Sequence, residues 1–496
     1  MKDRHTASKA AIHRGAWRFG VALLGCGLLT ACAAVEDTER EVPNVALPSA
    51  FKHADEPAAA AEPAAAEPAV QTPQSEWWKT FHSEELDRLV AAALANNHDL
   101  KVAIARVTQA DAQAGVTGAA QYPTLDASFK HSSTAPSGGV GTVIDTVKYE
   151  QQRTIQASLK TAWEIDLWGK NAYAAESALA LAQASVHFRE AVALTLVSDL
   201  TKSYIDFLAE SDRVRVAENN LANARSALGA ITTRMERGDA TIIEVQQQET
   251  AVANAEANVP VHLLLRAKAF NKLAALMGST PAELSLTGGT LANLEPPKVA
   301  AGIPSQLICR RPDIRRAEAN MLSANADIDV ARAKMYPNLS FSAEGGKGGY
   351  SFASLMTPQT MFYSLIGELT QSIFDAGKNA NGVRQSRARY KEMLETYRQV
   401  ITEAVHDVED ALASLKITSD QQKSLARAAG HARRAYELSS KSYDRGAVDY
   451  TTLLETQRTL FNTEDTETSI RADRLKAAVD LFKALGGGLE EPHCGE

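Results

Sequence analysis

One structural plan occurs twice in this chain of 496 residues, and the repetition limits which folds are possible. In each half a helical pattern stops at a Tyr-Pro pair, two alternating segments follow, and a long helical segment turns back at an Arg-Gly pair. The Tyr-Pro pairs begin 214 residues apart, whereas later glycines are 208 apart (Gly169 with Gly377, Gly238 with Gly446). The six-residue difference falls between the paired segments, where a surface loop can absorb it. The sequence therefore predicts an internal tandem duplication.

The alternating segments are predicted to be β-strands with one apolar and one polar face. In the first half, Leu125, Ala127 and Phe129 alternate with polar residues, and a second strand continues the pattern from Ile155 to Leu167. The second half repeats this from Leu339 to Ala343 and from Met361 to Phe374. The GGKGG run at 345–349 follows a strand without opening a helix, so a surface hairpin loop is expected there rather than a phosphate-binding loop.

Long helices are predicted around these strands. A helix is expected over 84–120, and a very long one to about Glu236 has apolar residues at seven-residue steps, as in a coiled coil (Leu200, Phe207, Val214, Leu221, Leu228, Met235). A helix over 241–277 returns from the turn at Gly238, and Pro260 should kink or divide it. The second half repeats this hairpin, with its turn at Arg445-Gly446 and its last helix ending near Leu485.

Strands of roughly 10 residues with one apolar face have the length of transmembrane strands. An open sheet edge in hydrocarbon leaves backbone groups unpaired, and four strands are too few to close a barrel, so several copies must pool their strands. The predicted fold class is mainly α with transmembrane β, in which long coiled-coil hairpins extend the ring of strands as a helical tube. The alternative is a soluble helical protein that carries two β-hairpins.

The N-terminus has the layout of an export signal. Basic residues precede an uncharged run from Phe19 to Ala31, which is too short to cross about 30 Å of hydrocarbon. Leu29-Thr30-Ala31 before Cys32 matches the site at which bacterial lipoprotein signals are cleaved and the cysteine is acylated. Cys32 is preferred to Cys26 because cleavage at Cys26 would leave a very short apolar run. The resemblance to bacterial lipoproteins implies that Ala33 after the cysteine, rather than Asp, fits sorting to the outer membrane. An ordinary secretory signal is the alternative.

The composition excludes several classes of function. Removing residues 1–31 leaves 47 positive and 59 negative charges, a net charge of −12, which disfavours nucleic acid as a partner. Cys309 and Cys494 would remain as possible thiols, too few for a disulfide framework or a zinc site, and whether they pair cannot be read from the sequence. The chain has no HExxH, CxxC or P-loop motif, so no enzyme, metal or cofactor is predicted beyond a covalent lipid on Cys32.

These observations predict five segments. They are a signal peptide (1–31), an acylated N-terminus with an Ala/Pro/Glu-rich linker (32–76), a first repeat (77–302), a second repeat (303–488) and a C-terminal tail (489–496).

The second repeat opens with a motif that resembles a known family. Ile303-Pro304-Ser305, the run from Arg310 to Arg315 (RRPDIR) and Tyr336-Pro337 look like the signature of outer-membrane efflux lipoproteins of the TolC superfamily, OprM/NodT type. The segment from Glu164 to Gly169 (EIDLWG) resembles it too, and the likeness covers nearly the whole mature chain. Within RRPDIR, Pro312 and Asp313 also make a good helix start, and that structural role is favoured over substrate contact.

The resemblance implies a homotrimer with a 12-stranded outer-membrane barrel and a periplasmic α-barrel. Such a trimer is the exit duct of a tripartite pump, working with a periplasmic adaptor (membrane fusion) protein and an inner-membrane RND-type transporter. The expected location is the outer membrane, with lipid on Cys32 and contact with membrane lipid.

The resemblance also places a gate at the hairpin tips. By motif alignment the acidic gate position falls on Glu455 and the apolar one on Thr451, with Arg458 one turn beyond, where the family often has Asp and Leu for the first two. Arg237, Asp239, Glu244, Arg445 and Asp449 are candidates for links between helices or adaptor contacts. A solvated helix face is the alternative for each.

Two rival functions stay open at this point. One is the exit duct of a protein-secretion system, and the other is a lipid-anchored coiled-coil scaffold of the envelope that conducts nothing. The sequence identifies neither the exported substrates nor the particular adaptor and transporter.

Overall fold

The computed structural model describes residues 48, 50–53, 76–134, 152–295 and 304–487. The chain divides into two compact units. The strand unit includes Asp111–Leu181 and Met321–Leu394, and the helical unit includes Val45–Ala110, Ala182–Asn320 and Glu395–Glu496. Cys32, the predicted linker and the C-terminal tail lie outside the described residues.

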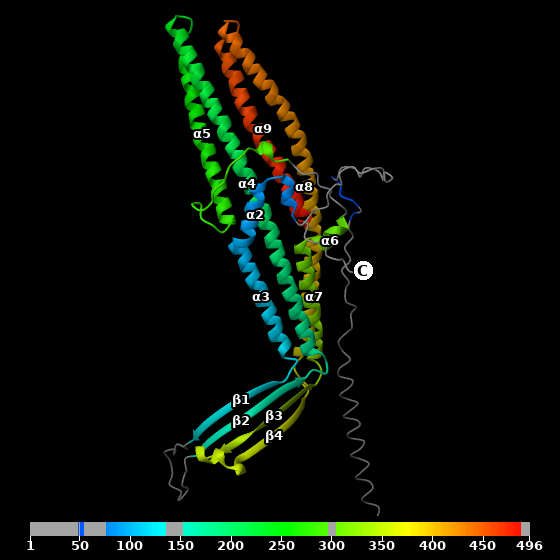
Figure 1. Cartoon of the computed structure of the whole chain (residues 1–496). Helices are drawn as coiled ribbons and strands as arrows, with labels where there is room; N and C mark the ends of the chain where they lie inside the picture. Colours follow the sequence, from blue (N-terminus) through cyan, green and yellow to red (C-terminus); the bar gives the residue numbers. More distant parts are fainter. Residues whose placement is uncertain (1–47, 49, 54–75, 135–151, 296–303, 488–496) are drawn as a thin grey trace, which may run out of the picture. The chain divides into compact units, whose positions relative to one another are not determined.

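The strand unit contains one antiparallel sheet of four strands in chain order (Figure 1). Its strands are β1 (Thr124–Thr134), β2 (Gln152–Ile165), β3 (Asn338–Gly349) and β4 (Met361–Thr370). The two halves of the chain meet where β2 pairs with β3, for example at Lys160 and Glu344. A single sheet therefore combines strands from both repeats, and its edges are β1 and β4.

The register places most of the large apolar residues on one face of the sheet, with Phe362 and Ile366 of β4 on the other. Leu125 is opposite Thr161, which is opposite Ala343, which is opposite Leu365. Large apolar side chains on this face are exposed, including Leu125 (73%) and Leu365 (69%). We call this surface the apolar face and its reverse the polar face; the predicted alternation is confirmed.

The glycine-rich run at 345–349 is not the hairpin loop that the sequence predicts, because it lies within β3. A Cβ at Gly346 would lie 2.2 Å from the carbonyl oxygen of Ala157 and 2.7 Å from Cα of Ser158. Glycine is needed at Gly346 because β2 and β3 approach closely here. The turn follows as the short 3₁₀ helices η4 (Phe352–Met356) and η5 (Pro358–Thr360).

The predicted helix over 84–120 is two helices, α2 (Glu84–Asn96) and α3 (His98–Ala119). Asn97 between them has non-helical backbone (φ −55°, ψ 131°). Its side-chain oxygen accepts a hydrogen bond from the Leu100 amide at 2.9 Å, and its side-chain nitrogen donates to the Leu276 carbonyl at 2.9 Å. An asparagine that caps a helix start can interrupt an apolar pattern that otherwise continues.

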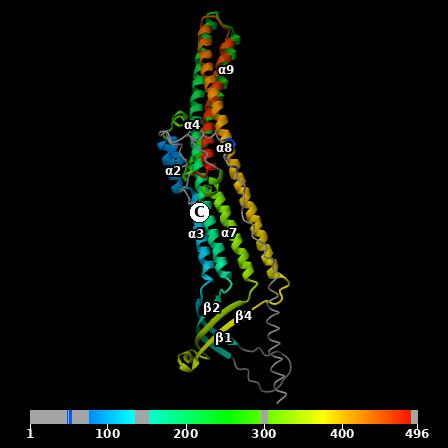
Figure 2. The ribbon, with the colours of Figure 1, turned by 90° about the vertical axis from the view of Figure 1, so that its right-hand side faces the viewer.

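The two predicted helical hairpins are present and equal in length. Helices α4 (Lys170–Glu236) and α8 (Lys378–Asp444) each have 67 residues, while α5 (Ile242–Leu276) and α9 (Tyr450–Ala484) each have 35. Pro260 does not divide α5, which continues through it. In the helical unit, α4, α8 and α9 run side by side in both views (Figures 1 and 2).

The core of the helical unit forms around the residues where the folded body is predicted to begin. Trp77, in the 3₁₀ helix η1 (Trp77–Phe81), is 1% exposed and stacks on Phe482 of α9 with ring centroids 5.1 Å apart. Leu200 of α4 and Leu273 of α5 belong to the same buried cluster. Aromatic residues of η1 thus tie together helices from both repeats.

The remaining elements lie in the segment that connects the two repeats and at the start of the second repeat. They are the 3₁₀ helices η2 (Leu291–Asn293) and η3 (Pro304–Gln306), then α6 (Leu307–Arg310) and α7 (Pro312–Ala333). Cys309 is in a disulfide, and the other three cysteines lie outside the described residues. None of the helices in the described residues combines the length and apolarity of a membrane-crossing helix.

The RRPDIR motif has a structural role. Helix α7 begins at Pro312, as predicted. The Arg311 guanidinium is buried and pairs with Asp313 at 2.7 Å and Asp407 of α8 at 2.8 Å, and it also donates to the Ala484 carbonyl at 3.0 Å. Burial lowers the pKa of Arg311, but the bonds and charges of Asp313 and Asp407 raise it by a larger amount, so the net shift is upward. The motif therefore joins three helical segments around one buried charge.

Candidate gate at the hairpin tips

Both hairpin tips turn through a glycine with left-handed backbone. Gly238 has φ of 84° and Gly446 has φ of 72°. The amide of Asp239 donates to the Arg234 carbonyl at 2.9 Å, and the amide of Ala447 donates to the Ser442 carbonyl at the same distance. This is the glycine-ended pattern that closes a helix C-terminus. The sequence signal Arg-Gly thus identified both turns correctly.

The returning helices begin at capping residues of different chemistry. In the first tip the Thr241 hydroxyl accepts from the Glu244 amide at 3.3 Å, and the Glu244 carboxylate accepts from the Thr241 amide at 2.7 Å. In the second tip one carboxylate oxygen of Asp449 accepts from the Thr452 amide at 2.9 Å and from its hydroxyl. These bonds from Thr452 lower the pKa of Asp449. Glu244 and Asp449, predicted as links or adaptor contacts, are thus both engaged in capping.

A buried cluster joins the two tips to each other. This tip cluster consists of buried residues from all four long helices (Ile231, Val245, Tyr443, Tyr450, Leu453), and further partly buried apolar side chains pack against it. The Tyr443 and Tyr450 rings meet edge to face with centroids 5.9 Å apart. Burial raises the pKa of Tyr450 to about 12, and the nearby Tyr443 and Glu244 add to the shift.

Polar side chains complete the tip cluster. The Tyr450 hydroxyl donates to the side-chain oxygen of Gln248, which is fully buried, and the Gln248 side-chain nitrogen donates to the Ala224 carbonyl at 2.7 Å. The Arg234 guanidinium lies 4.5 Å from the Tyr443 ring centroid and donates to the Tyr443 carbonyl at 3.0 Å. Within one chain, these contacts connect the first hairpin to the second. Buried polar groups that are fully bonded in this way favour one packing arrangement.

The predicted gate residues lie on one exposed face of α9. Thr451, Glu455 and Arg458 are spaced four and three residues apart, so they share a face of the helix. The Glu455 carboxylate and Arg458 guanidinium are 3.9 Å apart, and their side chains are 69% and 66% exposed. The opposite side of this turn carries Leu453 into the tip cluster. The three residues are therefore available to contact water, another copy of the chain or a partner.

The other predicted contact residues lie at the turns themselves. Arg237 and Asp239 are exposed in the first turn, and Arg445 is exposed in the second. Sequence reasoning missed Arg234, Gln248, Tyr443 and Tyr450, which make the inter-hairpin contacts. A polar Gln248 three residues after the apolar Val245 was a readable signal, because this spacing returns to the buried side of a helix.

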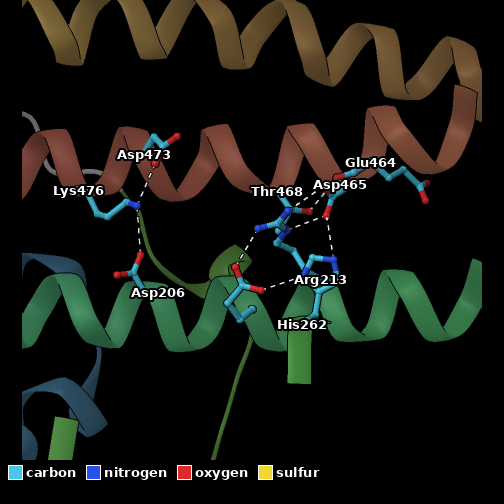
Figure 3. A network of polar contacts seen from close by, with 9 residues as sticks. Asp206, Arg213, His262, Glu464, Asp465, Thr468, Asp473 and Lys476 are labelled. Carbon is cyan, nitrogen blue, oxygen red and sulfur yellow. Dashed lines mark hydrogen bonds and ion pairs between the residues drawn. The ribbon is translucent and has the colours of Figure 1, made fainter. Parts of the chain in front are cut away.

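A second polar network fastens α4, α5 and α9 farther from the tips (Figure 3). Arg213 of α4 binds both oxygens of Asp465 of α9, at 2.7 and 2.9 Å, and it also bonds Glu210 at 2.9 Å. His262 of α5 is 2.9 Å from Glu210. The bond to Asp465 is the main cause of a raised pKa for Arg213. Lys476 of α9 forms a separate pair with Asp206 of α4 at 3.1 Å (Figure 3).

Comparison with known proteins covers both repeats. A family model described as "Outer membrane efflux protein" matches residues 89–279 and 303–487. The "Pyoverdine export outer membrane protein OpmQ" of Pseudomonas aeruginosa is 38% identical over 85% of this chain and 89% of that protein. The "Probable outer membrane lipoprotein SilC" of Salmonella typhimurium is 30% identical over 86% of this chain and 90% of that protein.

Solved structures have the same fold. A membrane protein from Pseudomonas aeruginosa is 27% identical, with a TM-score of 0.80 over 90% of this chain and 99% of that chain. The outer-membrane channel OprN gives a TM-score of 0.81 at 24% identity, over 91% of this chain and 98% of that one. The likeness extends over the sheet and the long helices together.

Proposed function

The chain belongs to the outer membrane efflux protein family and is an outer-membrane efflux channel, and we propose that it is the exit duct of a tripartite pump for small molecules. The family is one of channels rather than enzymes, and its members are trimeric outer-membrane components of such pumps. The observation that carries the proposal is the match of one efflux family to both repeats.

The sheet of a single chain supports assembly into a trimer. Its edge strands β1 and β4 have unpaired backbone groups, and its apolar face is exposed. Three copies pairing β1 with β4 would give 12 strands, with no edge left in the hydrocarbon. The polar face, with Asp126, Lys160 and Glu344 in one row, would then line a water-filled lumen.

We further propose two partners and an anchor. A periplasmic adaptor would bind near the hairpin tips, where Arg237, Asp239 and Arg445 are exposed, and an RND-type transporter would supply the cargo. Lipid on Cys32 would hold the chain to the membrane, and the name of SilC as a probable lipoprotein supports this. No catalytic residue is required, because the duct is passive.

The names of the relatives favour small cargo. They include a pyoverdine export protein, a solvent efflux protein and a cation efflux protein, at 38%, 29% and 27% identity. Because related ducts carry such different cargo, we infer that the inner-membrane partner selects it. These names favour efflux over protein secretion or an inert scaffold.

The gate is proposed on α9, with three copies of Glu455 forming an acidic ring, Thr451 a weak seal and Arg458 the partner of the carboxylate. The exposure of Glu455 and its 3.9 Å approach to Arg458 support this role, since an exposed carboxylate ring attracts cations. Removing the carboxylate should both weaken cation preference and release Arg458.

Planar-bilayer conductance of the purified protein tests the duct and the gate together. The wild-type chain should conduct, and Glu455→Lys should lower the cation-to-anion permeability ratio roughly three-fold or more, with Glu455→Gln in between. Glu249→Gln is the matched control, because Glu249 is an exposed carboxylate on α5 of the first tip. No wild-type conductance would refute the duct, whereas unchanged selectivity in Glu455→Lys would refute only the gate.

A further inference from the structure

The acidic residues of the sheet are confined to one of its two faces, whereas basic residues occur on both. All four acidic residues of the described strands lie on the polar face (Asp126, Glu164, Glu344, Glu368). The apolar face has no acidic residue in these strands, and it carries three basic ones, His131, Arg153 and Lys347. The register puts these three in the last rows of the sheet, at the ends of the strands remote from α3, α4, α7 and α8.

An apolar belt precedes the basic rows. From the row of Ile165 and Leu339 to the row of Phe129 and Lys347, the apolar face covers five rows, or roughly 27 Å along the strands at 3.4 Å per residue. A tilted strand of this length spans most of the apolar band of an outer-membrane barrel. The basic side chains therefore begin where hydrocarbon gives way to headgroups.

The turn after β3 folds back onto this same face. The Phe352 ring of η4 lies 6.4 Å from the ring of Phe129, which belongs to the apolar face. A Cβ at Gly349 would lie 1.9 Å from Oγ of Ser354, so η4 rests directly on the backbone of β3. Glycine at this position is what allows the turn to lie flat against the sheet.

The folded turn presents apolar groups in a fixed arrangement. Tyr350, Phe352 and Met356 are 75%, 64% and 75% exposed, and the run from Tyr350 to Met361 contains no charged residue. Ser351 and Ser354 cap η4 reciprocally, and the Ser354 carbonyl accepts from the Thr357 and Thr360 hydroxyls at 2.7 and 2.9 Å. Because these apolar side chains are exposed to solvent in the single chain, they suit insertion among lipid tails.

We propose that η4 together with Arg153, Lys347 and His131 forms a binding surface for the phosphate-bearing glycolipid of the outer leaflet, lipid A of lipopolysaccharide. This lipid-binding role is additional to the proposed role as an exit duct. It rests on one part of that proposed function, namely that the sheet lies in the outer membrane and the long helices lie in the periplasm. Sign complementarity selects this occupant, because cationic groups on a face whose described strands carry no acidic residue attract phosphates and repel basic partners.

The spacing of the basic groups suits a headgroup with more than one phosphate. In a regular sheet, Arg153 and His131 are one strand and one row apart, on the order of 8 Å between Cα atoms, and Arg153 and Lys347 are on the order of 14 Å apart. Long flexible side chains extend over such distances. The acyl chains would lie along the belt below, in contact with Phe352 and Met356.

The test uses the full-length protein purified in neutral detergent, with bound lipid A measured by native mass spectrometry. The double variant Arg153→Gln/Lys347→Gln should weaken binding about 25-fold, or about five-fold for each cationic group. The matched control is Lys130→Gln/Lys160→Gln, which removes two lysines from the polar face of the same sheet and should change binding less than two-fold.

Three further arms identify the occupant. Dephosphorylated lipid A should bind wild type as weakly as lipid A binds the double variant. Phe352→Ser/Met356→Ser should weaken both lipids equally, because it removes contacts with the acyl chains. Inorganic phosphate at millimolar concentration should not displace lipid A.

Each opposite result overturns the proposal. Equal loss in the Lys130/Lys160 control or indifference to the phosphates would exclude the charged contact, and displacement by free phosphate would reduce the surface to an anion site. A changed oligomeric state with unchanged lipid binding would make this face a protein interface. The Arg153/Lys347 variant should conduct like wild type, so a failure here is separable from a failure of the duct.

Discussion

At the first hairpin tip, Ile242 and Ile243 are 60% and 66% exposed, whereas the equivalent positions 208 residues later hold the buried Tyr450 and the polar Thr451. One helical turn further, Gln247 in the first tip corresponds to Glu455 in the second. The turns themselves match, since Gly238 and Gly446 have nearly the same φ. One tip thus exposes isoleucines and amides, and the other exposes an ion pair.

The comparison of the two tips separates the features that both repeats share from those that differ between them. Helix length, turn glycine and cap position are common to both tips, whereas the exposed face of the returning helix and the residue under it differ. The polar network shows the same divergence, because His262 of α5 corresponds to the buried Ile470 of α9. The two tips therefore share their backbone and differ in the surfaces that they expose.

The largest effect is expected from truncating the residue that only the second tip buries. Tyr450→Ala should reduce the local stability of the tip by about 3 kcal/mol, because it opens a cavity and leaves the buried side-chain oxygen of Gln248 without the donor that bonds it. Ile242→Ala, at the equivalent exposed position, should cost no more than about 0.5 kcal/mol. Hydrogen exchange in the first turns of α5 and α9 measures both. Equal losses would mean that the two tips are packed alike.

An intermediate and equal effect is expected from the turns. Gly238→Ala and Gly446→Ala should each cost about 1–2 kcal/mol, because left-handed backbone strains any residue with a Cβ. A Cβ would meet no atom within 4 Å at either site, so strain alone acts. Gly229→Ala within α4 is the control and should stabilise by about 0.5–1 kcal/mol. The three can be ranked by the same exchange measurement, and clearly unequal turns would contradict a copied backbone.

The smallest effect is a difference in pH dependence. Because the folded-state pKa of Asp449 is lowered, its capping contribution is present above the ordinary Asp pKa and is lost as pH falls through the lowered value. The hydroxyl of Thr241 does not titrate in this range. Acidification below about pH 4 should therefore reduce protection of the Thr452 amide more than that of the Glu244 amide.

Asp449→Asn keeps a capping side chain without the titration, so its protection should stay flat over the same range. Exchange rates corrected for their intrinsic pH dependence decide the matter. If the variant and wild type lose protection together, then the cap is not the source of the acid response.

Much of this fold was predictable because its period can be read in the sequence. Alternation across Leu125 to Phe129 and the seven-residue steps through Val214 correctly predicted the strands and the long helices, and Arg-Gly identified the turns. Two local predictions were wrong. Asn97 divides one helix by capping the next, and the glycines at 345–349 serve strand approach rather than a loop.

The site was less predictable, because its contacts join distant segments. Tyr450 and Gln248 are 202 residues apart in the sequence. Neither the strand alternation nor the helical periodicity reveals that their side chains form a hydrogen bond. Glu455 and Arg458 could be placed on one helix face from spacing alone, but their role depends on copies of the chain that meet around an axis. The gate assignment therefore stays a prediction for the conductance experiment.

The equal lengths of the paired helices restrict how this protein can evolve. One residue added to α4 alone would displace its tip by about 1.5 Å and rotate the later residues of the helix by about 100°, separating Arg234 from Tyr443 of the other hairpin. Substitutions are tolerated along both hairpins, as the two tips show, but insertions and deletions there would have to occur in matched sets. The six residues by which the repeats differ lie instead between the paired strands, so the long helices act as a molecular ruler.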